Sequence, residues 1–310
     1  MKSLFFIFSS AVYLGTFSAI AYGKCNIYES GPGVLMSFRD EIVHSNIGGK
    51  KMSPDNLGLH GSTAKIFTLG MGNGSGGLVK IPQGDGFIYR VITVGHNFFG
   101  ETKKNVNFND ATGEFEKVGR LTPPDVTFGE PVREYVRING VTTAKNTISS
   151  DLNSSRLKFK AKEIRCLPEM GKVMSGELCF LELEGEIPTW LKNEAQLYKP
   201  FDELSKTEKK EYYKMYLSGY PSGYGNWNIR RYSNCDTNES SLIKFDDYKG
   251  SYTTRCSASS AVSGGPISLY SRKSKSFITV GTFQGIVEKG VKNRFTTGKY
   301  SRAVSIWRND

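Results

Sequence analysis

The chain has 310 residues, of which 38% are hydrophobic and 23% are charged, and its formal net charge is +11. This composition is ordinary for a globular protein and excludes a disordered chain. The basic residues are scattered rather than gathered in one block, and no zinc-finger, RNA-recognition or helix-turn-helix signature is present, so no nucleic-acid partner is expected.

The first 23 residues predict a signal peptide for export. Lys2 supplies the positive start, an apolar stretch interrupted by serines follows, and Ala21 and Gly23 offer small residues to a signal peptidase. No later stretch is apolar enough to span a bilayer. We therefore expect a secreted or periplasmic protein with no integral membrane segment after cleavage, and residues 24–59 as a lead-in or propeptide. The sequence does not indicate the oligomeric state.

From residue 60 onward, short strand-like runs alternate with turns rich in Gly, Asn and Pro. The expected strands span residues 63–69, 77–81, 87–94, 134–138, 157–162, 178–183, 215–218, 277–282 and 303–307. Ser205 and Glu208 form a capping-box pattern, which predicts one short helix leading into residues 209–215. The many short strands indicate an all-β fold built as a barrel or a pair of barrels.

Five cysteines follow the signal: Cys25, Cys166, Cys179, Cys235 and Cys256. In an oxidising compartment they can form two bridges and leave one thiol, but the sequence does not give the pairing. Our hypothesis pairs Cys235 with Cys256, because the two flank one polar loop. No cysteine pair has metal-ligand spacing and the three histidines are not clustered, so neither a metal nor another cofactor is expected.

Two segments carry residues suited to nucleophilic catalysis. Residues 91–96 form an apolar strand that ends in a tight turn and presents His96. Ser263 lies among small residues in the run 260–267, where a turn can hold its side chain clear and aim peptide N–H groups at an oxyanion. Taken separately, the histidine segment is better explained by a histidine that fills a core gap, and the serine segment is explained equally well by a simple loop.

A third segment supplies a carboxylate. Glu177 directly precedes the apolar run 178–183, and from there it can accept the second imidazole N–H and fix the histidine tautomer. The alternative is a glutamate at a strand end that simply faces solvent. Asp151 and Asp125 are the other acids that we consider for this role.

The order of histidine, acid and serine in these surroundings resembles the trypsin-like (chymotrypsin-fold) serine peptidases, particularly the bacterial exported members. The histidine element of the family matches residues 91–96, its Gly-x-Ser-Gly-Gly-Pro element matches 261–266, and its acid followed by an apolar strand matches 177–183. A Gly-rich run at 74–79 and the Gly-Tyr-Pro run at 219–221 agree as well. The resemblance extends over residues 60–308.

This resemblance implies two six-stranded β-barrels, spanning roughly residues 60–190 and 191–310, with a short helical insertion. It implies a secreted serine endopeptidase that hydrolyses protein or peptide substrates through an acyl-enzyme. Ser263 would be the nucleophile, His96 its base and Glu177 the group that orients His96. The backbone N–H groups of Ala261 and Ser263 would form the oxyanion hole, and Ser257 would lie near the floor of the primary pocket.

Three departures from the family pattern suggest alternatives. Glu177 stands where the family has Asp, and Ala261 stands where it has Gly, so a positive φ at this position would disfavour alanine. A catalytically inactive relative that binds proteins through the same cleft is therefore the second hypothesis, and a basic, β-rich adhesion protein is the third. Val262 replaces an Asp that anchors a freshly cleaved N-terminus in many animal members, so we expect no activation of that kind.

Overall fold

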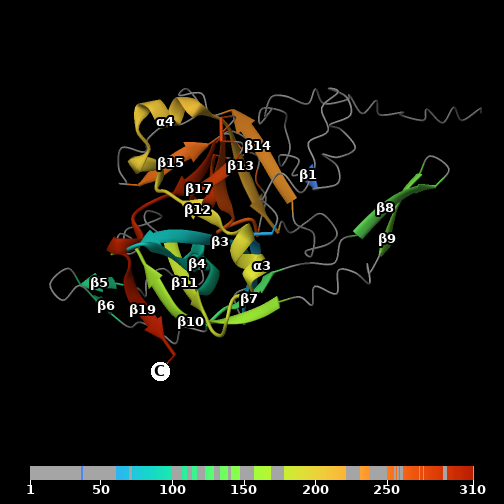
Figure 1. Cartoon of the computed structure of the whole chain (residues 1–310). Coiled ribbons are helices and arrows are strands. Elements are labelled where there is room, and N and C mark those ends of the chain that lie inside the picture. The colour runs from blue at the N-terminus through green and yellow to red at the C-terminus, as the bar shows by residue number, and fades with distance from the viewer. Residues whose placement is uncertain are drawn as a thin grey trace, which may run out of the picture.

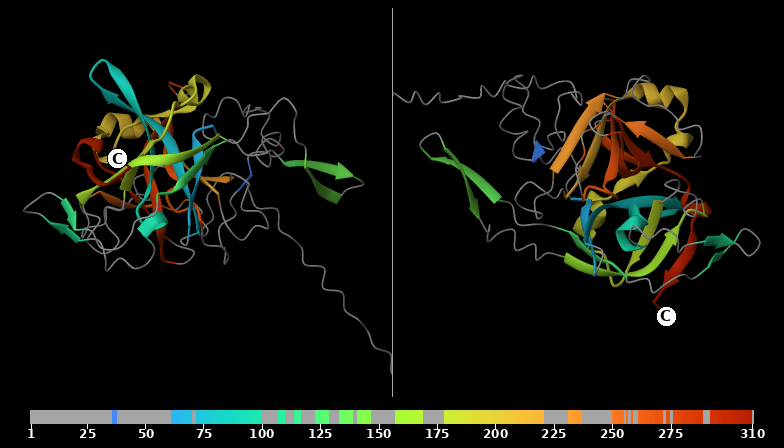
Figure 2. Two further views of the ribbon diagram at one scale, coloured as in Figure 1. Left: turned by 90° about the horizontal axis from the view of Figure 1, so that it is seen from below. Right: turned by 180° about the vertical axis from the view of Figure 1, so that it is seen from behind.

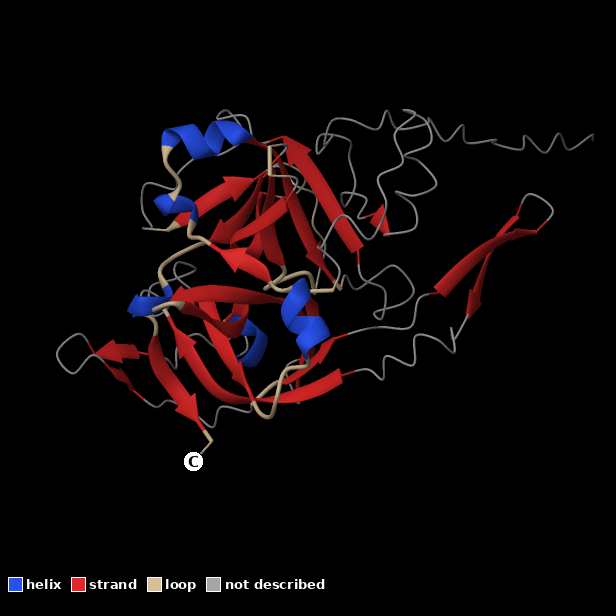
Figure 3. Cartoon of the chain, viewed as in Figure 1, coloured by secondary structure: helices blue, strands red, loops and turns tan. Residues whose placement is uncertain are grey.

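The computed structural model describes residues 36–37, 61–69, 72–99, 107–109, 114–116, 123–128, 133–138, 141–146, 157–168, 178–220, 231–236, 250–254, 256, 258, 261–271, 273–274, 276–288 and 292–309. Strands dominate these residues, and the helices are few and short (Figures 1 and 3). The expected signal peptide lies outside the described residues, as does the lead-in apart from one two-residue strand.

The strands are β1 (Met36–Ser37), β2 (Thr63–Thr68), β3 (Gly72–Gln83), β4 (Gly86–Val94), β5 (Asn107–Asn109), β6 (Glu114–Glu116), β7 (Asp125–Phe128), β8 (Arg133–Ile138), β9 (Val141–Asn146), β10 (Leu157–Cys166), β11 (Leu178–Leu183), β12 (Gln196–Tyr198), β13 (Tyr212–Gly219), β14 (Arg231–Asp236), β15 (Ser251–Thr254), β16 (Pro266–Ser271), β17 (Ser276–Glu288), β18 (Lys292–Thr296) and β19 (Val304–Arg308). The helices are α2 (His96–Phe99), α3 (Thr189–Glu194), η6 (Phe201–Glu203), α4 (Lys206–Glu211) and η8 (Tyr300–Arg302).

Six antiparallel strands close into a barrel in the order β3, β2, β7, β10, β11, β4 and back to β3. Alternation along β10 shows why these residues form strands: Phe159 and Ala161 are buried, whereas Lys158 and Lys160 face solvent. This period of two places one apolar row inside the barrel. Apolar side chains from all six strands, including Ile66, fill the first core.

A second group of six strands follows the order β14, β13, β16, β17, β18 and β15 around its own core. Met215, Leu217, Ile267, Val280 and Phe295 are among the buried side chains of this core. The expectation of an all-β fold with short helices is therefore confirmed. Of the two six-stranded barrels expected, the first is closed, and the second corresponds to this group of six paired strands.

Strand β12 joins the two groups. It pairs in parallel with β3 of the first barrel and with β17 of the second group, and it lies between them in Figure 1. Figure 2 shows the same arrangement from below and from behind. The two cores thus meet along β3, and this is the strand that reaches the candidate site.

The short helix agrees with its predicted start but not with its predicted end. The Ser205 hydroxyl accepts from the Glu208 N–H and the Glu208 carboxylate accepts from the Ser205 N–H, which confirms the capping box. The expectation that the helix leads on to residue 215 is wrong, because β13 begins at Tyr212. The second core explains the change, since Met215 and Leu217 alternate into it and extended pairing with β16 buries them.

The capping box gives a pH-dependent prediction. The ion pair with Lys199, followed by the Ser205 hydrogen bonds, lowers the pKa of Glu208 to about 2. A depressed pKa contributes stability that is complete above the unfolded-state value near 4.5 and is lost as the pH falls through about 2. We expect Glu208→Gln, which keeps the capping oxygen, to lower the urea unfolding midpoint at pH 7 and to lower it much less at pH 2, where about half of the Glu208 carboxyl is protonated. Equal losses at both pH values would contradict this assignment.

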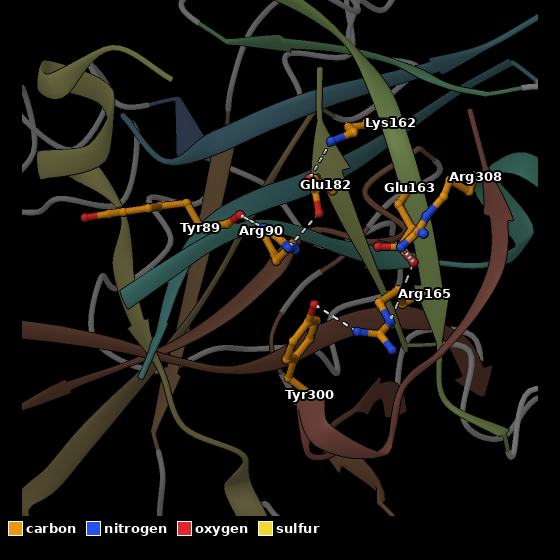
Figure 4. A network of polar contacts seen from close by, with 8 residues as sticks. All are labelled: Tyr89, Arg90, Lys162, Glu163, Arg165, Glu182, Tyr300 and Arg308. Atoms are coloured by element: carbon orange, nitrogen blue, oxygen red, sulfur yellow. Dashed lines mark hydrogen bonds and ion pairs between the residues drawn. The ribbon is translucent and has the colours of Figure 1, made fainter. Parts of the chain in front are cut away.

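The C-terminal strand returns to the first barrel. β19 pairs with β10, and Arg308 Nη2 lies 3.2 Å from the buried Glu163 carboxylate. Beside this pair the ring of Tyr300 lies between the guanidinium groups of Arg90 and Arg165, whose central carbons are 5.8 and 5.5 Å from its centre (Figure 4). Ion pairs and cation–π contacts therefore hold the chain end against the barrel wall.

One disulfide joins neighbouring barrel strands. Cys166 of β10 and Cys179 of β11 face each other in register and are bonded. Such a bond is typical of a protein in an oxidising compartment. Within the described ranges, no helix is both long and apolar enough to cross a membrane.

Candidate active site

Ser263 lies in a turn of residues 261–265, called here the Ser263 turn, directly before β16. The turn is fixed to β17, because Gly264 N donates to Phe283 O at 2.7 Å and Phe283 N donates to Gly265 O at 2.8 Å. Val262 points into the second core and is fully buried, whereas Ser263 is half-buried. Burial of Val262 therefore leaves the serine on the outer side of the turn.

His96 lies where β4 ends and α2 begins. Phe98 N donates to Gly95 O at 3.0 Å, which closes the first turn of α2, and the Phe98 ring is buried in the first core. His96 itself is half-buried. The predicted placement of this histidine at the end of an apolar strand is thus what the structure shows.

A side-chain hydrogen bond connects these two elements. Asn97, the residue after His96, donates from Nδ2 to Ser263 O at 2.9 Å across 166 positions of sequence, and it also donates to Thr93 Oγ1 at 2.9 Å. Gly74 makes room for this contact, because a Cβ there would lie 2.3 Å from the Asn97 amide. The structure therefore brings the segments of His96 and Ser263 together at the junction of the two strand groups.

The backbone of the Ser263 turn leaves two donors available. Ala261 has φ +64°, and it is the one non-glycine residue with positive φ among those described, at a cost of about 1–2 kcal/mol for such a residue. Gly264 has φ +86°. Within the described part of the chain, the N–H groups of Ala261 and Ser263 donate to no acceptor. Two unpartnered peptide N–H groups beside a serine hydroxyl are what an oxyanion hole requires.

Two of the predicted site residues, Glu177 and Ser257, lie outside the described residues, as does Asp151. The strand register nevertheless bears on Glu177, because Leu178 pairs with Val94, two residues before His96. Asp125, the other acid considered, makes an ion pair of 2.7 Å with Lys158.

A second disulfide involves Cys256. Cys256 is disulfide-bonded, and since Cys166 and Cys179 bond each other, its partner is Cys25 or Cys235. The Sγ atom of Cys256 is 3.7 Å from Met215 O, and Met215 is the register partner of Cys235. This proximity supports the predicted pairing of Cys235 with Cys256, which stays a hypothesis.

Sequence reasoning missed three polar residues that support the site: Ser75, Thr93 and Asn97. Each is attached to the Ser263 turn directly or through one hydrogen bond. The available signals were the position of Asn97 next to His96 and the single serine within a Gly-rich run. No cluster of metal-ligating side chains was found in the described ranges.

No protein-family model and no curated protein matches this sequence. The similar solved structures include proteases and a mutant of human heparin binding protein (CAP37). The latter is 11% identical, with 76% of this chain and 85% of that chain covered and a TM-score of 0.47. Protease Anisep from Arthrobacter nicotinovorans is 14% identical, with 77% of this chain and 90% of that chain covered and a TM-score of 0.47. The thermostable serine protease AL20 from an extremophilic microorganism is 13% identical, with 76% and 89% covered and a TM-score of 0.45.

A Glu endopeptidase in complex with MPD is also 13% identical, with 80% of this chain and 89% of that chain covered and a TM-score of 0.46. Identities this low concern the fold and say nothing about the reaction of this chain.

Proposed function

We propose that this protein is a secreted serine endopeptidase with Ser263 as nucleophile and His96 as general base. The observation that supports it best is the Asn97 bond to the Ser263 carbonyl, because it ties the histidine segment to the serine turn. The bond connects the histidine segment of one strand group to the serine turn of the other, and a histidine and a serine with two backbone N–H donors are the minimum set of groups for acyl transfer.

The proposed reaction proceeds in two stages. His96 takes the Ser263 proton while Oγ attacks the scissile carbonyl carbon, and the resulting oxyanion accepts hydrogen bonds from the N–H groups of Ala261 and Ser263. His96 then gives its proton to the leaving amine as the C–N bond breaks, which leaves an acyl-enzyme. In the second stage His96 deprotonates a water, the water attacks the ester carbonyl, and Ser263 regains its proton.

The remaining roles belong to the same proposal. Glu177 accepts the second imidazole N–H of His96, and Ser257 lies near the floor of the pocket for the substrate side chain. The substrate is a protein or peptide, and no step in the scheme requires a cofactor. Export by a signal peptide over residues 1–23 is in keeping with the disulfide at Cys166 and Cys179.

A fluorophosphonate probe tests this function without knowledge of the substrate. The activated Ser263 oxygen should displace fluoride and form a phosphonate ester, so we expect labelling of the folded wild type and none of Ser263→Ala. Heat-unfolded wild type is the control for non-specific reaction. An unlabelled wild type that shows a native circular dichroism spectrum would overturn the enzyme and favour the inactive protein-binding relative.

A further inference from the structure

We propose that Ser75 is a positioning residue that holds the oxyanion-hole side of the Ser263 turn in its active conformation, an inference that rests on the proposed function. Ser75 belongs to β3 of the first barrel and is fully buried. It therefore contacts the turn from behind, and its hydroxyl is not placed to react.

Ser75 binds the Ser263 turn at two carbonyl groups. Its N–H donates to Ser263 O at 2.8 Å, and its hydroxyl donates to Ala261 O at 2.9 Å. The same hydroxyl accepts from Tyr220 N at 2.9 Å, which leaves its proton directed at Ala261. Thr93 Oγ1 donates to Ser75 O at 2.8 Å, so the neighbouring barrel strand in turn fixes this segment. Ser75 thus holds two peptide planes, that of residues 261–262 and that of residues 263–264. The plane between them, of residues 262–263, carries the Ser263 N–H.

The hydroxyl matters because of the backbone at Ala261. A residue with a Cβ tends to leave the left-handed region, and doing so rotates the peptide planes on either side of its Cα. One of these planes ends in the carbonyl that Ser75 holds, and the other carries the N–H that would face the oxyanion. The Ser75 hydroxyl therefore opposes the relaxation that would turn the Ala261 N–H away.

The hydrogen bond from Ser75 to Ala261 O also bears on the positive φ of Ala261, which is unfavourable for alanine. Glycine takes φ +64° without steric cost and needs no such restraint. An alanine there requires an added contact, and the structure supplies one from the facing barrel. The inactive relative is thus not favoured by Ala261 alone.

Rates of fluorophosphonate labelling test this inference. We expect Ser75→Ala to lower the maximal labelling rate about tenfold, with little change in the probe concentration for half-maximal rate, because the oxyanion hole acts in the transition state. In the Ala261→Gly background the same substitution should cost less than about threefold, since glycine keeps the conformation unaided. Equal losses in both backgrounds would overturn the inference.

Ser218→Ala provides a matched control. Ser218 is as deeply buried as Ser75, and its hydroxyl bonds Thr63 Oγ1 at 3.0 Å across the same junction of strand groups. The Ser218 backbone lies against Gly265, but among the described residues the Ser218 hydroxyl makes no hydrogen bond to the Ser263 turn. We expect the labelling rate of Ser218→Ala to stay within about twofold of wild type, because only stability should fall. A tenfold loss in Ser218→Ala would show that buried hydroxyls here act through general stability.

Urea unfolding of four proteins (wild type, Ser75→Ala, Ala261→Gly and the double variant) separates failure of this inference from failure of the proposed function. In wild type, loss of the Ser75 hydroxyl lets Ala261 relax and recover part of its strain, whereas in the Ala261→Gly background there is no strain to recover. Ser75→Ala should therefore lower the urea midpoint more in the glycine background. If wild type is not labelled but the urea midpoints show this non-additivity, the proposed enzyme is rejected and the role of Ser75 is kept. If Ser75→Ala lowers the midpoint equally in both backgrounds, the role of Ser75 is rejected.

Discussion

His96→Ala is expected to slow fluorophosphonate labelling of Ser263 by about 10⁴-fold or more, the range found when the base of a catalytic triad is removed. Without the imidazole, the serine oxygen keeps its proton and is a poor nucleophile. The fold should survive, because His96 is half-buried and the neighbouring Phe98 of α2 packs into the first core. The measurement is the second-order labelling rate constant, followed by intact-protein mass over seconds for wild type and days for the variant.

His60→Ala is the matched control, because His60 has no role in the proposed reaction. Its labelling rate should equal that of wild type. If His96→Ala keeps more than a tenth of the wild-type labelling rate, His96 is not the general base.

Glu177→Gln is expected to lower the labelling rate by about 10⁴-fold, as loss of the triad carboxylate does in well-studied serine proteases. The amide keeps the size of the side chain but stabilises the wrong imidazole tautomer and cannot balance the imidazolium charge. Glu177 is the preferred acid because Leu178, the next residue in the sequence, pairs with Val94 of the strand that leads to His96.

Asp125→Asn and Asp151→Asn are the comparison variants. Asp125 is already paired with Lys158, so Asp125→Asn should lower stability slightly, as the loss of a surface ion pair does. The labelling rate should stay within about twofold of wild type. A large loss of rate only in Asp151→Asn would show that the third member of the triad comes from the segment before β10.

Local patterns in the sequence predicted the parts of the fold that depend on local chemistry. The bounds of β11 agree with the apolar run 178–183, because a strand buried on both faces reads as a continuous apolar segment. The capping box at Ser205 was also predicted, because its two partners are only three positions apart in the sequence. The end of α4 was missed, because the second core rather than helix propensity decides it at Tyr212.

The support of the site could not be predicted, because it depends on register between distant strands. The disulfide of Cys166 and Cys179 follows from the pairing of β10 with β11, which the cysteine spacing does not reveal. Likewise, Ser75 reads as one small residue in a Gly-rich run until β3 is placed against the Ser263 turn. The motif residues themselves were recognisable, since their neighbours in sequence shape the turns that present them.

The structure of the phosphonylated protein, solved by crystallography, tests the central claim most directly. The account predicts a bond from Ser263 Oγ to phosphorus and a phosphonyl oxygen about 2.7–3.1 Å from the N–H groups of Ala261 and Ser263, with the His96 ring beside the modified oxygen. A phosphonyl oxygen directed away from both N–H groups, or an imidazole facing another region of the protein, would contradict it.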